Sequence, residues 1–291
     1  MKTTTIRLLT ICLTLVLALC FIACSDTTAN PNSTTDAPAD NTPGATVWDV
    51  TFTGDDWSAP AEAAITQDAN VTLLQKAGTY RISGTLNDGQ IRVRIAKTEK
   101  ITLIFDNLTA ASSTTAPVYI ESADKVTVEL KDGTTNTLTD AKDYVFNGTD
   151  TKPNACLYSS EDITIKGNGK LIVNANYNNG IGSKNDLKIK GGSYEIKAVK
   201  NALKGNDSVT IESGNILITR CNDGIKTDAT ETGRGILTIS GGTIDIHAED
   251  DGLQASQKID VTGGLITVEA LGKVTNCDGT TNIATGCLVE K

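Results

Sequence analysis

Short runs of alternating apolar and polar residues recur along this chain, most clearly between residues 178 and 272. Apolar side chains stand two positions apart within each run, as at Leu187 and Ile189, and again at Ile216 and Ile218. A period of two predicts β-strands that turn one face inward. The runs are about four to six residues long, which is too short for helices.

The runs belong to a longer repeat whose copies start 22, 22 and 28 residues apart, at Asn178, Lys200, Asn222 and Asp250. The third copy is longer because residues 229–235 enlarge one turn. Each copy contains one glycine corner, where a positive φ is expected: Gly191-Gly192, Ser213-Gly214, Gly241-Gly242 and Gly263-Gly264. Such a period indicates stacked units. We predict a right-handed parallel β-helix, and reading the pattern back to Val71 gives about eight rungs, a rung being one circuit of the chain.

The first 23 residues have the composition of a secretory signal, in which Lys2 and Arg7 precede an uncharged apolar run. This run is too short for a confident membrane span. Residues 21–24, Phe-Ile-Ala-Cys, resemble the bacterial lipobox, in which the cysteine receives diacylglycerol. We therefore expect lipidation of Cys24 and a lipid anchor at the bacterial cell surface, with cleavage and free secretion as the alternative.

The remaining chain divides by composition into three parts. Residues 24–45 are rich in Ser, Thr, Asp, Asn, Pro and Ala, which predicts a disordered tether. Residues 46–272 form the predicted β-helix domain, and residues 273–291 follow its last rung as a C-terminal cap. The repeat is interrupted between residues 140 and 153, which we expect to form a protruding loop.

The positions of the cysteines and the net charge limit which disulfides and which partners we expect. Cys277 and Cys287 bracket a turn-rich segment, and in an exported protein we expect a disulfide there, with two free thiols as the alternative. Cys156 and Cys221 fall about three rungs apart, on the order of 14 Å, which is too far for a disulfide. The net charge is −9, which argues against nucleic acid as a partner. We expect a monomer.

Stacking the copies aligns one position that changes from amide to carboxylate: Asn179, Asn201, Asp223 and Asp251. Amides in register hydrogen-bond to one another. Two carboxylates about 5 Å apart instead repel by about 0.8 kcal/mol in water, and by more near a protein surface. Converging oxygen ligands suit Ca²⁺, so the pattern predicts a calcium site formed by Asn222, Asp223, Asp250 and Asp251. The alternative is a set of solvated turn residues, because Asn-Asp-Gly also favours a turn.

A second aligned position faces outward, next to an inward apolar residue on each rung: Tyr158, Gly182, Lys204, Lys226 and Gln254. Tyr158, Lys204 and Lys226 could bind an extended sugar chain, with the ring beneath a pyranose and the ammonium groups on hydroxyls or carboxylates. The alternative is a solvated face that Asp207 and Asp228 neutralise. An aromatic content of 4% argues against a broad stacking platform.

Several stretches taken together resemble the bacterial carbohydrate-binding β-helix domain family, which is related in fold to pectate lyases. These are AGTYRISGTLNDGQIRV, DKVTVELKDGTTNTLTD, PNACLYSSEDITIKGNGKL, NDGIKT and ISGGTIDI. The resemblance covers roughly residues 47–272. It implies a calcium-containing solenoid that binds plant cell-wall polysaccharide, cellulose-like or pectic, without turnover.

The leading hypothesis is therefore a surface-anchored, calcium-binding polysaccharide-binding protein that is not an enzyme. One alternative is a polysaccharide lyase, in which calcium holds a uronate and Lys204 or Lys226 abstracts the α-proton. Lysine serves as such a base only if burial or neighbouring cations lower its pKa. The other alternative is a structural adhesin or spacer, in which the aligned polar residues only hold the rungs together.

Overall fold

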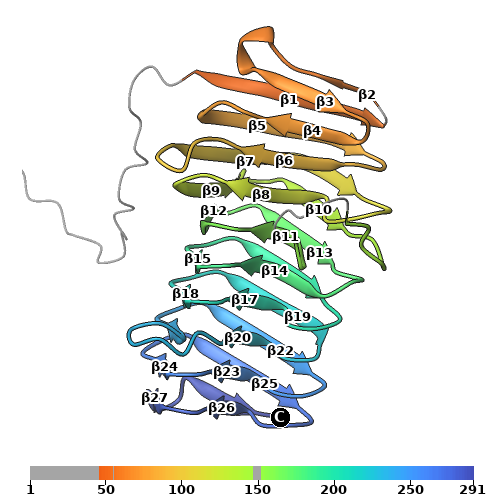
Figure 1. Ribbon diagram of the computed structural model, residues 1–291. Helices are drawn as coiled ribbons and strands as arrows, with labels where there is room; N and C mark the ends of the chain where they lie inside the picture. The colour runs from red at the N-terminus through yellow and green to blue at the C-terminus, as the bar shows by residue number, and fades with distance from the viewer. Residues whose placement is uncertain (1–45, 55, 147–151) are drawn as a thin grey trace, which may run out of the picture. The chain divides into compact units, whose positions relative to one another are not determined.

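The alternating segments form strands throughout the part of the chain that the structure describes. This computed structural model describes residues 46–54, 56–146 and 152–291, which belong to one unit, Gly44–Lys291 (Figure 1). The predicted signal peptide, Cys24 and the tether lie outside the described residues. Within them are 28 strands and one short 3₁₀ helix, η1 (Ala61–Ala63). No helix in the described ranges is long and apolar enough to cross a membrane.

One side of the fold is a 10-stranded sheet to which each rung adds one strand. Its pairs are parallel, except that β3 runs antiparallel to β4 at the N-terminal end. In chain order its strands are β3 (Ile65–Asp68), β4 (Val71–Leu74), β6 (Gln90–Arg94), β8 (Val118–Ser122), β11 (Ala155–Ser159), β14 (Asn179–Ser183), β17 (Leu203–Gly205), β20 (Ile225–Thr227), β23 (Leu253–Ala255) and β26 (Thr275–Cys277).

The other sheet has 18 strands and begins with β1 (Val47–Gly54), β2 (Asp56–Ser58), β5 (Gly78–Leu86) and β7 (Lys100–Ala111). It divides after β7, because β7 pairs with both β9 and β10. One branch contains β9 (Lys125–Leu130), β12 (Asp162–Gly167), β15 (Asp186–Ile189), β18 (Ser208–Ile211), β21 (Ile236–Ile239), β24 (Lys258–Val261) and β27 (Thr280–Ile283). The other contains β10 (Thr135–Thr139), β13 (Lys170–Asn174), β16 (Ser193–Lys197), β19 (Asn215–Cys221), β22 (Thr243–Ala248), β25 (Leu265–Ala270) and β28 (Leu288–Glu290).

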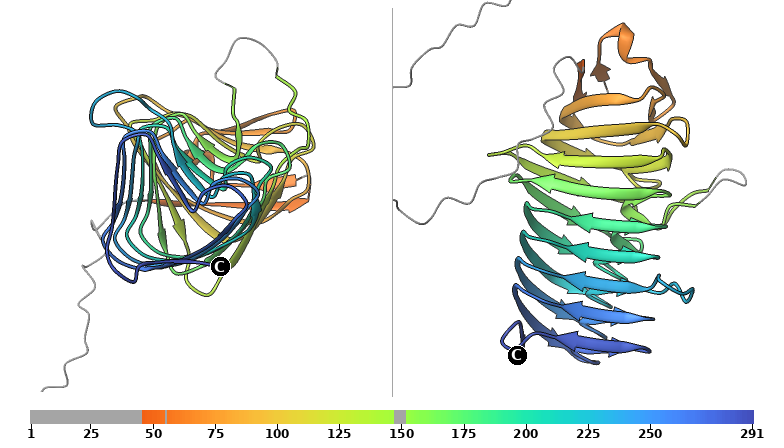
Figure 2. Two further views of the ribbon diagram at one scale, coloured as in Figure 1. Left: turned by 90° about the horizontal axis from the view of Figure 1, so that it is seen from below. Right: turned by 90° about the vertical axis from the view of Figure 1, so that its left-hand side faces the viewer.

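Stacking of these strands along one axis gives a parallel β-solenoid of about nine rungs, which confirms the predicted fold class (Figure 2). The sequence predicted about eight, and the difference arises at the C-terminal end. Residues 273–291, predicted as a cap, form β26, β27 and β28, which pair in parallel with the rung before them. Cys277, Ile283 and Leu288 pack against the core, so this segment continues the solenoid.

The core is a set of stacked apolar columns, as the period of two predicts. Leu187, Val209, Leu237 and Ile259 pair in register on successive strands and have no exposed surface. At about 25 cal/mol per Å² of apolar surface buried, such columns supply the main stabilising contribution. Backbone hydrogen bonds pair every strand with the strands of the rungs on either side. This pairing fixes the positions of the outward residues as well.

The glycine corners are present where the sequence predicts them. Gly192, Gly214, Gly242 and Gly264 have φ values of +95°, +123°, +95° and +91°. This left-handed region is costly for residues with a Cβ, so glycine defines where each rung turns.

The N-terminal end is closed by the antiparallel pair β1–β2 and by Trp48, which is 7% exposed and whose ring centroid lies 5.0 Å from that of Tyr80. Trp48 thus helps to cover the core of the first rung.

Candidate functional site

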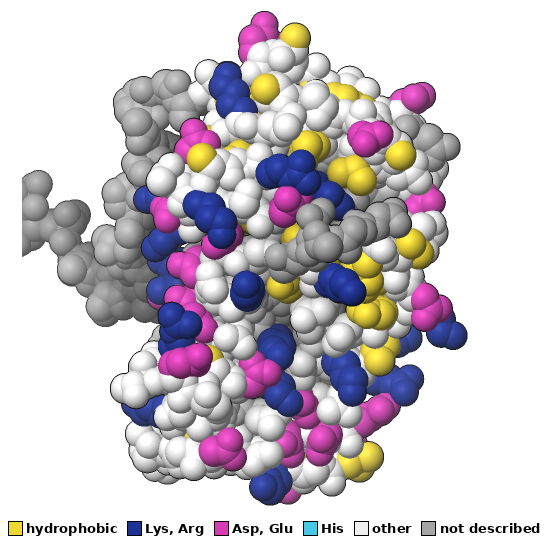
Figure 3. Space-filling model, in the orientation of Figure 1, with side chains coloured by type: hydrophobic (Ala, Val, Ile, Leu, Met, Phe, Trp, Pro, Cys, Tyr) yellow, Lys and Arg dark blue, Asp and Glu magenta, His cyan; other side chains and the backbone are white. Residues whose placement is uncertain are grey.

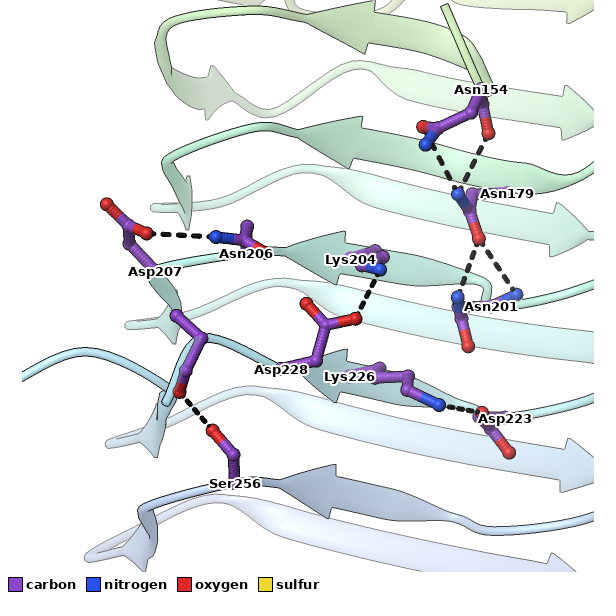
Figure 4. Close-up of polar contacts among 11 residues, drawn as sticks. Asn154, Asn179, Asn201, Lys204, Asn206, Asp207, Asp223, Lys226, Asp228 and Ser256 are labelled. Carbon is purple, nitrogen blue, oxygen red and sulfur yellow. Dashed lines mark hydrogen bonds and ion pairs between the residues drawn. The ribbon is translucent and has the colours of Figure 1, made fainter. Parts of the chain in front are cut away.

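A column of asparagine residues runs along the corner at which the chain enters the 10-stranded sheet (Figure 4). Nδ2 of Asn179 donates to the backbone oxygen of Asn154 at 2.8 Å. Oδ1 of Asn179 accepts hydrogen bonds from Nδ2 of Asn201 at 2.7 Å and from the Asn201 backbone N–H at 3.2 Å. Because an amide both donates and accepts, each asparagine satisfies its neighbour without an ion.

The same column continues as carboxylates on the next two rungs. The Asp251 backbone N–H donates to Oδ1 of Asp223 at 3.3 Å, and the Lys273 backbone N–H donates to Oδ1 of Asp251 at 2.9 Å. Nδ2 of Asn276 donates to Oδ2 of Asp251 at 2.6 Å. A carboxylate cannot donate in return, so acceptor oxygens accumulate here. Sequence reasoning missed Lys273 and Asn276, because Thr275 takes the inward place of Leu253 and hides the last repeat.

Three of the four predicted metal ligands converge at this corner. Asp223, Asp250 and Asp251 each offer a carboxylate oxygen, and these oxygens lie within 4.8 Å of one another. Asp223 is 3% exposed and Asp251 is 6% exposed, whereas Asp250 is exposed to solvent. Two buried carboxylates with a third at the surface form an oxygen-rich cluster, which is a ligand set of the type that Ca²⁺ prefers.

Asn222 lies beside this cluster, but its amide nitrogen faces it. Nδ2 of Asn222 donates to Oδ1 of Asp223 at 3.1 Å. Rotating the amide by 180° would present its oxygen instead, at the loss of this hydrogen bond. The carboxylates therefore fit a hard cation as they stand, and Asn222 fits only after that rotation.

A lysine already supplies one positive charge to the cluster. Nζ of Lys226 lies 2.9 Å from Oδ2 of Asp223, and the Lys226 side chain is 24% exposed (Figure 4). Lys226 was predicted as a sugar ligand, whereas here it neutralises part of the predicted metal site. An ammonium group beside a carboxylate competes electrostatically with a metal ion for the same oxygen.

The outward column of the 10-stranded sheet has the predicted register. Tyr158 pairs with Gly182, Gly182 with Lys204, and Lys204 with Lys226. The Tyr158 side chain does not form an open sugar platform, however, because the residue is only 6% exposed. The centroid of its aromatic ring lies 5.9 Å from that of Tyr119, which belongs to the preceding rung. Tyr158 is thus part of a buried aromatic cluster, which corrects the expectation that its ring is available to a pyranose.

Lys204 is paired as well. Nζ of Lys204 lies 2.6 Å from Oδ2 of Asp228, in agreement with the alternative of a neutralised face. Asp207, the other expected partner, is instead 3.3 Å from Arg234. On the face shown in Figure 3, basic and acidic side chains are interspersed. The strip defined by Tyr158, Lys204 and Lys226 is therefore a paired and partly buried surface.

The chain is similar to known proteins in both sequence and structure. A family model described as carbohydrate-binding domain-containing protein matches residues 67–287. The chain belongs to this family. A protein of the same description from Acetivibrio thermocellus is 43% identical over 241 residues, which cover 82% of this chain and 84% of that relative. A solved structure, the polysaccharide lyase-like protein from C. thermocellum as a gadolinium derivative, matches with a TM-score of 0.82 and 45% identity. The match covers 84% of this chain and 100% of that one.

In this member of the carbohydrate-binding domain family, the predicted disulfide is not formed. Cys277 and Cys287 are free thiols, as are the buried Cys156 and Cys221. Cys277 ends β26 in the 10-stranded sheet, whereas Cys287 directly precedes β28 in the other sheet, with β27 between them. The cysteines therefore pack against the core from different sides of the last rung.

The ion pairs of the outward lysines bear on the lyase alternative for this carbohydrate-binding domain. A lysine that abstracts a proton must present a neutral amine to its substrate. Lys204 and Lys226 both donate to carboxylates, from Asp228 and Asp223. That is the arrangement of ion-pairing lysines, and it argues against either lysine as the base.

Proposed function

We propose that this protein is a calcium-dependent binder of plant cell-wall polysaccharide, cellulose-like or pectic, which is held at the bacterial cell surface by a lipid on Cys24 and does not turn its ligand over. Family membership supports carbohydrate binding in general. The calcium dependence, the choice of polysaccharide and the anchor go beyond what family membership supports. The anchor rests on the sequence of residues 1–45 alone.

The observation that carries the proposal is the convergence of Asp223, Asp250 and Asp251. Buried carboxylates are unfavourable unless a cation or hydrogen-bond donors offset their charge. Lys226 supplies one positive charge to a group of three carboxylates. A divalent cation bound here would neutralise the remaining charge and leave coordination positions for oxygen atoms of a sugar. The related solved protein was obtained as a gadolinium derivative, and gadolinium is a hard cation that prefers oxygen ligands.

The decisive experiment compares the wild type with the double variant Asp223→Asn/Asp251→Asn. The variant extends the neutral asparagine column, so we expect it to stay folded while losing the calcium response. For the wild type, calcium at a hundredfold excess over its Kd should raise the free energy of unfolding by about 2.7 kcal/mol, and chelation should lower the melting temperature. Melting curves with calcium or with EDTA measure both.

The second half of the experiment measures retention on insoluble cellulose and on polygalacturonate. We expect retention to fall when EDTA is added to the wild type, and the double variant to behave in calcium as the wild type does in EDTA. Retention that does not change when EDTA is added would restrict calcium to a structural role. A wild-type melting curve that does not change when calcium is added would reject the cation site. Release of unsaturated uronate products would show lyase activity instead. The intact mass of the exported protein tests lipidation of Cys24.

A further inference from the structure

A pocket of about 370 Å³ opens beside the same corner of the solenoid and extends from the carboxylate cluster toward the N-terminal rungs. Four successive rungs contribute to it through residues at or just after the ends of β13, β16, β19 and β22, and the loop after β10 completes it. The polar residues at its wall are Lys142, Asn176, Lys197, Arg220 and Glu249. Ala175, Ala198 and Val199 form its apolar part. Neighbouring rungs thus place residues from distant parts of the sequence around one cavity.

The loop that carries Lys142 is attached firmly to the rung beneath it. The Asp140 carboxylate accepts hydrogen bonds from the Asn176 backbone N–H and from the Tyr144 hydroxyl, the latter at 2.7 Å. Nδ2 of Asn176 donates to the Asp140 backbone oxygen at 2.9 Å. The Tyr144 ring stacks on Tyr177, with centroids 4.1 Å apart and planes inclined by 17°. These contacts fix one wall of the pocket before any ligand binds, which reduces the entropy lost on binding.

The charges of the pocket are opposite in sign to those of the whole protein. The chain has a net charge of −9, yet three cationic side chains and one carboxylate line the pocket. Arg220 and Glu249 pair at 2.7 Å. Lys142 and Lys197 are exposed, and within the described ranges neither forms an ion pair or a side-chain hydrogen bond. Two unpaired ammonium groups therefore face a shared cavity, and they favour an anionic ligand.

The apolar part restricts what kind of anion fits. Ala175 and Ala198 are nearly fully buried beneath the pocket, while Val199 is 51% exposed at its edge. A small inorganic anion would leave this apolar surface in water, whereas the C–H face of a pyranose ring would cover it. Asn176 adds an amide within the pocket for hydroxyl groups.

We propose that this pocket binds a carboxylate-bearing pyranose, a uronate residue of an acidic polysaccharide, through Lys142 and Lys197. The site is separate from the cluster of Asp223, Asp250 and Asp251, and its contacts require no metal ion. Glu249 directly precedes Asp250 in the chain, so the two sites adjoin along the corner. A single extended acidic glycan would pass from the lysine pocket to the carboxylate cluster.

The test measures binding of trigalacturonate by calorimetry in EDTA, where the carboxylate cluster is without metal. We expect the wild type to bind, and Lys142→Gln/Lys197→Gln to bind at least about tenfold more weakly because two ammonium partners are lost. The matched control is Lys125→Gln/Lys184→Gln, which removes the same charge from exposed lysines outside the pocket and should bind like the wild type. Cellotriose, which has no carboxylate, should bind much more weakly to the wild type.

A second variant tests the pocket without removing a lysine. Val199→Asp places a carboxylate at the exposed edge and should weaken trigalacturonate binding while leaving the melting temperature unchanged. Equal affinity of the wild type and the lysine double variant would overturn the inference, and so would equal affinity for the neutral trisaccharide. Asp223→Asn/Asp251→Asn should retain this binding in EDTA. Binding that appears only with calcium would reject the pocket while leaving the proposed calcium-dependent function intact.

Discussion

The corner column has an amide half and a carboxylate half, and the two satisfy their hydrogen bonds differently. In the amide half, Asn179 and Asn201 donate and accept along the column. In the carboxylate half, Asp223 and Asp251 only accept, from backbone N–H groups, Lys226 and Asn276. The backbone path is nearly the same in both halves. The change of side chain alone converts a column whose amides satisfy one another into one in which acceptor oxygens accumulate.

In a repeating backbone, the inward columns and the outward columns along one surface have separate roles. The inward columns keep every rung in place, so outward positions can change chemically without loss of the fold. Three substitutions test how far this separation extends.

The largest effect is expected at the glycine column that flanks the corner. A Cβ added to Gly224 would lie 2.4 Å from the backbone oxygen of Gly252 and 2.7 Å from Cγ2 of Ile246. Gly224 does not have a positive φ, so crowding rather than backbone strain makes the position intolerant. Gly224→Val should lower the free energy of unfolding by at least about 3 kcal/mol.

The amide half provides the matched control for this substitution. Ala202 occupies the same column on the preceding rung, so Ala202→Gly should cost only about 1 kcal/mol. Chemical denaturation of both variants measures the difference. A Gly224→Val variant as stable as the wild type would contradict the register of the rungs described above.

An intermediate effect is expected at Asp140, a buried carboxylate on the same corner whose partners are neutral donors. Burial raises the pKa of Asp140 from 3.8 to about 6. Between those values the native state holds a proton that the unfolded state has released, so stability falls as pH rises through this window. The free energy involved is on the order of 3 kcal/mol, because one pKa unit corresponds to about 1.4 kcal/mol.

Asp140→Asn should remove this pH dependence, since the amide stays neutral. The melting temperature of the wild type relative to Asp140→Asn should therefore rise as pH is lowered from about 7 to about 4. Asp143→Asn removes a charge from an exposed position of the same loop and serves as the control. A constant difference between wild type and Asp140→Asn across this range would show that the carboxylate does not titrate there.

The smallest effect concerns the lysine inside the carboxylate half. If a cation binds at Asp223, the Lys226 ammonium, whose Nζ lies 2.9 Å from Oδ2 of Asp223, opposes it. Lys226→Gln should then strengthen calcium binding about tenfold, or about 1.4 kcal/mol, as measured by calorimetry. Lys204→Gln removes an equal charge one rung away, where the partner is Asp228, and should change calcium affinity little. Weaker calcium binding by Lys226→Gln would mean that Lys226 helps to shape the site.

The repeating features of this protein follow from its sequence. The period of two and the glycine corners predicted parallel strands, turns and inward columns. The repeat placed Asp223 and Asp251 at equivalent positions, and the structure brings their carboxylates together with that of Asp250. Such predictions succeed because each rung pairs in register with the next, so that equal sequence positions become neighbours in space.

Only the tertiary structure decided which outward side chains are accessible and with which groups they pair. Tyr158 is covered partly by Tyr119, 39 positions earlier, and Lys226 reaches Asp223 on its own rung rather than solvent. The pocket of Lys142 and Lys197 requires a loop to fold back onto another rung. Burial and ion pairing depend on groups that different rungs and loops bring to one place, and those groups do not repeat with the period of the chain.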